Sequence, residues 1–198
     1  MNYVRELVGP TVEPTTLAEA RLWCRVDDDD ETQDAMLLLL IAAAREKAEE
    51  ITGRGFASRR LEYRMDAFPT DGSAIELPFP PLRSVEYITY ATSNGDVTLS
   101  GSPQAFDVDT GSTPGRIAPL NGGGWPSASD QIASVRIGYT CGYAKVTAMP
   151  KALRIYMQAR VATIYEHREQ LVMNNIVEIP RDFCEGMLDG LRVKTGFV

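Results

Sequence analysis

The most regular pattern of apolar and polar positions covers residues 30–53 and predicts a long helix. Asp30 and Gln33 have the spacing of a capping box, and Gly53 stands where helices commonly end in a left-handed residue. The apolar positions between them recur at i, i+4, i+7, i+11 and i+14, at Leu37, Ile41, Ala44, Ala48 and Ile51.

The first half of this helix carries more apolar residues than one buried stripe needs. Residues 35–44 are apolar on every side, and such a helix is usually covered on more than one side. The run is about ten residues, too short for a bilayer, which needs about twenty. The simpler interpretation is a helix deep in the chain's own core. The alternative is a contact with a second copy, with Leu38, Leu39, Ala42, Arg45 and Glu49 as candidate interface residues.

Three shorter patterns predict the other helices. Thr16 and Glu19 form a second capping box, which opens a helix reaching about Val26 and an αα-hairpin with the long helix. Pro150 suits the first position of a helix that runs to about residue 168. Pro180 opens a last helix, in which Phe183, Met187 and Leu191 share one side.

The period changes to that of strands at about residue 59. Short alternating segments separated by Gly, Pro and Ser predict an antiparallel sandwich or barrel-like module. The expected strands are residues 61–66, 74–77, 85–92, 97–99, 106–109, 116–120 and 133–139. The fold class is therefore α+β. The two halves of a helical bundle frame, residues 1–58 and 145–198 with two helices each, flank an inserted β module at 59–144, in one compact unit overall.

Composition and charge limit the partners of the chain. The net charge of −7 over 198 residues argues against a surface that holds nucleic acid, although not against a protein that lets nucleic acid pass. Cys24, Cys141 and Cys184 are widely spaced, and we expect reduced thiols of a cytosolic product. The first residues lack the pattern of a signal peptide, and no segment predicts a membrane span.

The sequence holds no recognisable catalytic or metal-binding set. His167 is the one histidine and has the pattern of a solvated helical residue, and the Asp27–Asp30 run is better explained by helix capping than by cation binding. Gly122–Gly124 is not followed by the Lys and Ser/Thr of a phosphate-binding loop. We therefore expect no enzyme, no cofactor and no metal. Trp125, next to this loop, is either a packing residue or a contact residue.

Both ends of the chain resemble a known family. The segment TLAEARLWCRVDDDDETQDAMLLLLIAAAREKAEEITGR, and later GYTCGYAKVTAMPKALRIYMQARVATIYEHRE with VEIPRDFCEGMLDGLRV, are similar to the first and last helices of head–tail connector (adaptor) proteins of long-tailed phages. The Met-Pro-Lys-Ala-Leu, Tyr-Glu-His-Arg-Glu and Ile-Pro cues occur in the expected order. The resemblance covers about 90 residues, which the three segments total, and it extends to phage-like gene transfer agents.

The resemblance implies a non-enzymatic ring, usually twelve-fold, docked beneath the portal of a particle at its head–tail junction and assembled in the host cytoplasm. Such a ring offers a platform to the next tail protein, a stopper or terminator, and leaves a channel through which DNA passes without specific binding. Trp125 is the candidate tail-side contact. The C-terminal segment has the pattern of an apolar anchor flanked by cations, although it could instead simply close the bundle. The candidate portal-docking residues are Phe183, Met187, Leu191, Arg192, Lys194, Phe197 and Val198.

Two rival interpretations remain from the residues themselves. An enzyme of unrecognised type would need a cleft whose side chains have shifted pKa values. A β-rich module that binds carbohydrate or peptide would use aromatic side chains as a platform, with Tyr87, Tyr90, Trp125 and Tyr139 as its candidates. Such a module would be monomeric and would not need an apolar girdle on a helix.

Overall fold

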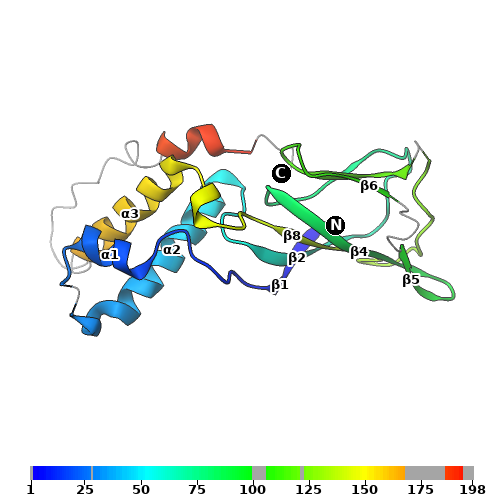
Figure 1. The fold of residues 1–198 in the computed structure, drawn as a ribbon. Coiled ribbons are helices and arrows are strands. Elements are labelled where there is room, and N and C mark those ends of the chain that lie inside the picture. The colour runs from blue at the N-terminus through cyan, green and yellow to red at the C-terminus, as the bar shows by residue number, and fades with distance from the viewer. Residues whose placement is uncertain (1, 28, 100–105, 121–122, 168–185, 194–198) are drawn as a thin grey trace, which may run out of the picture. The chain divides into compact units, whose positions relative to one another are not determined.

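The structure is a computed structural model that describes residues 2–27, 29–99, 106–120, 123–167 and 186–193 (Figure 1). The chain divides into two compact units. The sheet unit contains the described residues of Met1–Thr11 and Ala57–Gly142, and the helical unit those of Val12–Phe56 and Tyr143–Lys194. The fold is mixed α+β, with two antiparallel sheets.

The helical unit begins with α1 (Leu17–Cys24), which the predicted capping box opens. The Thr16 hydroxyl accepts the Glu19 backbone N–H at 3.2 Å, and the Glu19 carboxylate accepts the Thr16 N–H at 2.9 Å. The Arg21 guanidinium then donates hydrogen bonds to the carboxylate of Asp34, from Nη2 at 2.6 and 2.7 Å and from Nε at 2.9 Å, and so ties α1 to the start of the next helix.

The long helix starts later than the sequence predicts. Asp30 does not form a capping box with Gln33, because its carboxylate accepts the Thr32 N–H at 3.0 Å and caps a 3-10 turn, η1 (Glu31–Gln33). The α-helix α2 follows as Asp34–Thr52. Gly53 ends it in the left-handed conformation, with φ +68°, as expected.

The unit is completed by η3 (Val146–Ala148), α3 (Lys151–Glu166) and η5 (Gly186–Leu191). The expected helix from Pro180 is not seen in its described part, because residues 186–191 form a 3-10 helix. The tighter helix turns a different residue inward: Leu188 is buried, whereas Met187 and Leu191 are half-buried. Figure 1 shows α1, α2 and α3 packed together, and their shared core is formed by Ala20, Leu37, Ile41, Ala44, Leu153, Met157 and Val161.

The sheet unit contains a larger and a smaller sheet. The strands of the larger one lie in the order β1-β2-β8-β4-β5, and those of the smaller one in the order β3-β7-β6. The strands are β1 (Tyr3–Val8), β2 (Arg59–Met65), β3 (Ile75–Glu76), β4 (Leu82–Thr92), β5 (Gly95–Leu99), β6 (Phe106–Asp109), β7 (Arg116–Pro119) and β8 (Val135–Cys141).

The two sheets share one apolar core but do not close into a barrel. Ile88 and Ile137 of the larger sheet lie in the same buried cluster as Ile117 of the smaller one. Among the described strands, β1 and β5 each pair on one side only, so the predicted barrel-like closure is wrong and the sheet is open. The sequence patterns did not predict β1, which pairs with β2 so that Arg5 lies opposite Glu62.

The outer face of the larger sheet is polar. Tyr87 of β4 lies across Gly138 of β8, where any Cβ would collide with its ring. Its hydroxyl donates to the Glu62 carboxylate at 2.7 Å. Burial, together with this hydrogen bond to an anion, raises the pKa of Tyr87 to about 12.

Gly142, directly after β8, allows the chain to pass close to the backbone of Ala57. Its φ is +87°, and a Cβ there would collide with the backbone carbonyl of Ala57. Gly142→Ala should therefore lower the free energy of unfolding by about 1–3 kcal/mol, because both the conformation and the contact become strained. Urea unfolding measures this. Gly124→Ala is the matched control, since nothing lies within 4 Å of its Cβ position, and it should change stability by less than about 0.5 kcal/mol. Equal effects would contradict the steric explanation.

Candidate assembly surfaces

Helix α2 has two apolar faces that differ in what covers them. Leu37, Ile41, Ala44 and Ala48 are buried in the core of the helical unit. On the opposite side of the helix, Leu38 is 52% and Leu39 69% exposed. Leu38 and Leu39, which belong to the apolar residues beyond the one buried stripe, therefore lie outside this core.

These exposed residues belong to one continuous stripe. Positions 35, 38, 39, 42 and 46 recur at helical spacing on the side away from the core. We call this set, Ala35, Leu38, Leu39, Ala42 and Glu46, the α2 outer stripe. Its apolar part presents two leucines between two alanines to solvent, and an exposed apolar area of this kind marks a contact surface.

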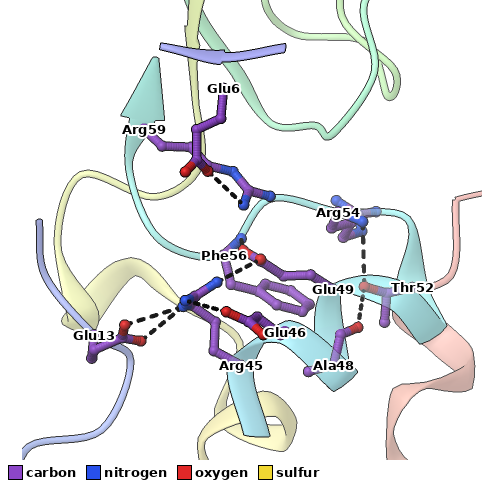
Figure 2. A network of polar contacts seen from close by, with 10 residues as sticks. All are labelled: Glu6, Glu13, Arg45, Glu46, Ala48, Glu49, Thr52, Arg54, Phe56 and Arg59. Atoms are coloured by element: carbon purple, nitrogen blue, oxygen red, sulfur yellow. Dashed lines mark hydrogen bonds and ion pairs between the residues drawn. The ribbon is translucent and has the colours of Figure 1, made fainter. Parts of the chain in front are cut away.

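Arg45 and Glu49, the other two candidates for the ring interface, have a different environment. Both side chains are 6% exposed, and the Arg45 Nη1 donates to the Glu49 carboxylate at 2.9 Å. The Arg45 Nε donates to Glu13 at 2.9 Å (Figure 2). Burial works to lower the pKa of Arg45, but the carboxylates of Glu13 and Glu49 outweigh it and raise that pKa.

The same carboxylate also fixes the chain after α2. While Glu49 Oε2 accepts from Arg45, its Oε1 accepts the backbone N–H of Phe56 at 2.8 Å (Figure 2). The Phe56 carbonyl accepts the Tyr143 N–H at 3.2 Å. Glu13, Phe56 and Tyr143 thus lie at or next to the points where the chain passes between the units, and one buried ion pair holds two of them.

The predicted portal-docking residues are only partly described. Phe183, Lys194, Phe197 and Val198 lie outside the described residues. Met187 and Leu191 are half-buried, and Arg192 is exposed beside Asp189, with its Nε 2.9 Å from that carboxylate.

The chain next to these residues is fixed at its end. The Val193 N–H donates to the Thr52 carbonyl at 2.8 Å, and Arg54 donates to the Leu191 carbonyl at 2.5 Å. Leu191 and Val193 are therefore held at the C-terminal end of α2.

Trp125 is used for packing. Its ring stacks on Phe68 with centroids 5.1 Å apart and 6° between the planes. Its indole N–H donates to the Ser73 carbonyl at 2.9 Å. Both the apolar face and the polar atom of this side chain therefore have intrachain partners, and of the two sequence-based alternatives the structure favours packing.

The aromatic platform of the rival binding module does not form. Tyr139 is buried, with its hydroxyl donating to the Pro78 carbonyl at 3.0 Å, and Tyr90 packs edge-on against Phe68. Tyr87 lies on the opposite, polar face of the sheet over Gly138. The side chains divide between two faces, so they cannot present a common surface.

The described residues offer no metal site either. Within them no group of three or more His, Cys, Asp or Glu is placed to hold an ion. His167, an exposed residue, ends α3. Among the described helices, none has the length and apolar character to cross a membrane.

One family model matches part of the chain. Residues 14–100 match the family model described as "Phage gp6-like head-tail connector protein". This region includes α1, α2 and the strands β2 to β5. No curated protein matches the chain in sequence.

Solved structures extend the similarity to nearly the whole chain. A chain of "Neck of empty GTA particle computed with C6 symmetry" has a TM-score of 0.78 and 20% identity, covering 98% of this chain and 96% of its own. A chain of "Virion of native gene transfer agent (GTA) particle" has a TM-score of 0.77 and 20% identity, with 97% and 96% covered. A chain of "Neck of native GTA particle computed with C12 symmetry" has a TM-score of 0.65 and 19% identity, with 96% of each covered. At this identity the similarity establishes the fold.

The buried ion pair gives a stability test. Glu49→Ala removes one partner of Arg45 and the acceptor of the Phe56 N–H, and should cost about 3–5 kcal/mol of unfolding free energy, because a buried charge loses its compensation. Chemical unfolding of dilute protein measures it. Glu50→Ala on the same helix, where the side chain is 70% exposed, is the control and should cost less than about 1 kcal/mol. If both variants unfold alike, the network does not have this role.

Proposed function

The chain belongs to the phage gp6-like head-tail connector protein family, and on that premise we propose that copies of it form the ring, twelve-fold by the family's usual order, between the portal and the tail of a phage or phage-like particle. Members of this family are structural connector proteins, so the chain is a structural protein rather than an enzyme. The location that the proposal implies is the neck of the particle, at its head–tail junction.

The observation that carries the proposal is the α2 outer stripe. Leu38 and Leu39 project from the side of α2 opposite its buried face, and no described residue of the chain covers them. A stable protein gains from covering such a surface, and neighbouring copies in a ring would do so. Two similar structures are necks of GTA particles, computed with C6 and with C12 symmetry, and they support the same arrangement.

The ring proposal divides the five candidate interface residues into two roles. Leu38, Leu39 and Ala42 form the contact itself. Arg45 and Glu49 act from inside, because their buried pair holds the C-terminal half of α2 in place. The exposed side of the helix then has a fixed orientation when a neighbour arrives.

The sheet unit is the part that we propose to offer a platform to the tail-side stopper or terminator. In this proposal residues 59–144 of the unit are an insertion between two halves of a helical frame, and β1 from the N-terminal residues adds to it. Trp125 would support this platform indirectly, by fixing its loop on Phe68. The net charge of −7 suits a ring whose channel passes DNA without retaining it, since binding to duplex DNA depends on clustered cations.

The portal contact is assigned to the C-terminal segment, with Phe183, Met187, Leu191, Arg192, Lys194, Phe197 and Val198 as its residues. Its support is the hydrogen bond that holds Val193 on Thr52, together with the exposure of Arg192 beside it. An apolar chain end flanked by cations could enter a groove on the portal ring.

Assembly tests the ring. Leu38→Glu combined with Leu39→Glu places two charges on the contact and should abolish oligomers, while helix content stays unchanged because neither residue is in the core. Sedimentation velocity and far-ultraviolet circular dichroism measure the two effects. Leu22→Glu on α1 is the matched control, since Leu22 is 76% exposed outside the stripe, and it should assemble normally. A loss of helix content in the double variant would contradict the assignment.

Truncation tests the docking. Deleting residues 194–198 should abolish binding to the portal protein of the same particle and change the melting temperature by less than about 2 °C, because the deletion removes a contact with the partner and no described core residue. Binding is measured by co-sedimentation with portal rings, and melting by calorimetry. Normal portal binding by the truncated protein would exclude the tail as the anchor.

A further inference from the structure

A ring built of head-to-tail contacts needs two different surfaces on every subunit. In such a contact one patch of a copy meets a second, unlike patch of its neighbour. The α2 outer stripe supplies one patch. The proposed ring therefore requires a complementary surface elsewhere on the chain, and nothing so far identifies it.

Helix α3 carries a second stripe on the side away from its own core. Its buried residues are Leu153, Tyr156, Met157 and Val161. Opposite them, positions 151, 155, 159 and 162 recur at i, i+4, i+8 and i+11. We call this set, Lys151, Ile155, Ala159 and Ala162, the α3 outer stripe. Lys151 is exposed and Ile155 is 45% exposed, whereas the two alanines are half-buried and Ala162, at the end of the stripe, also packs in part against the core of the helical unit.

We propose that the α2 outer stripe of one subunit packs antiparallel on the α3 outer stripe of the next. This inference rests on the proposed ring and names its two faces. The stripes have equal length, because residues 35–46 and 151–162 each advance by eleven residues, or about 16 Å of α-helix. One antiparallel register therefore aligns them from end to end.

In this register large side chains meet small ones. Ala42 lies opposite Ile155, and the Leu38–Leu39 pair lies opposite Ala159. Ala35 then meets Ala162. Helices pack closely when the ridges of one enter the grooves of the other, and alternation of large and small residues provides this fit.

The charges of the two stripes match in the same register. Glu46 ends the α2 stripe with a side chain that is 71% exposed, and its carboxylate lies 3.5 Å from Nη2 of Arg45. Lys151 begins the α3 stripe and would face Glu46. Glu166, the next position on that side of α3, would lie beyond Asp34, where α2 begins, so it does not face the apolar stripe.

The exposed apolar side chains of α1 are weaker candidates. Leu22 is 76% and Trp23 41% exposed, but α1 has only eight residues. These two adjacent residues do not form a stripe that could match three turns of α2.

Cysteine cross-linking tests the register directly. In full-length protein with Cys184→Ser, Ala42→Cys together with Ile155→Cys should give, on oxidation of the assembled ring, a ladder of covalent oligomers up to the closed ring. An equal mixture of the two single variants should give heterodimers and nothing larger. Cys24 and Cys141 are buried and remain as they are.

Charge exchange tests the same contact by another route. Glu46→Lys and Lys151→Glu should each weaken the association constant per contact about two- to fivefold, the usual effect of an exposed ion pair, and the double variant should restore it. Glu50→Lys is the matched control, because it makes the same charge change on α2 at a position outside the stripe. Sedimentation equilibrium over a concentration series measures association.

The outcomes separate this inference from the ring itself. Rings that appear in electron micrographs but give no ladder would overturn the α2–α3 contact and leave the connector ring standing. Dimers of the Ala42→Cys variant alone would also overturn it, since they require a symmetric α2–α2 contact. If the wild-type protein forms no ring, alone or on the portal, both proposals fail.

Discussion

The buried pair of Arg45 and Glu49 is the interaction on which the helical unit depends. Two charges are taken out of water near the C-terminal end of α2, and this is tolerated because nearly every polar atom finds a partner. Arg45 divides its donors between Glu13 and Glu49, and Glu49 divides its two oxygens between Arg45 and the Phe56 N–H. A buried ion pair of this kind contributes specificity of geometry more than net stability. What it specifies here is the path of the chain where it enters and leaves the unit.

That constraint explains how α2 can have two apolar faces without being disordered. Leu37, Ile41, Ala44 and Ala48 hold the helix on its inner side, and the ion pair and Gly53 hold its end. Leu38 and Leu39 on the outer side are then not needed to hold the helix in the unit. Their exposure costs the free subunit hydration free energy, which burial in an assembly would recover. In the proposed ring, the fold and the assembly of the subunit would use different sides of this one helix.

In the sheet unit, by contrast, the large aromatic side chains pack within the unit itself. Trp125, Tyr90 and Tyr139 pack in or against the shared core, and Tyr87 lies over a glycine with its hydroxyl on a carboxylate. Aromatic residues in a β-rich segment are thus no evidence of a binding platform until their faces are known. Alternation along a strand sends neighbours to opposite faces, so the sum of aromatic residues says little about any one surface.

Local patterns in the sequence determined most elements of this fold. The Thr16–Glu19 capping box, the left-handed Gly53, the buried stripe of α2 and the approximate positions of strands β2 to β8 depend on residues close together in the chain, and the structure has them where the patterns predicted. The excess of apolar residues on α2 likewise indicated a surface beyond the core. Tertiary structure alone decided the rest, because those features join distant residues. Glu13 meets Arg45 across 32 positions, β1 pairs with β2 across more than fifty, and the sheet stays open because β1 and β5 find no partners among the described strands. The burial of Arg45 and Glu49 could not be predicted from their i, i+4 spacing, because that spacing suits a solvent-exposed helix surface equally well. Tertiary packing fixes the distances between remote segments. It alone buried the Arg45–Glu49 pair and left Leu38 and Leu39 outside the core.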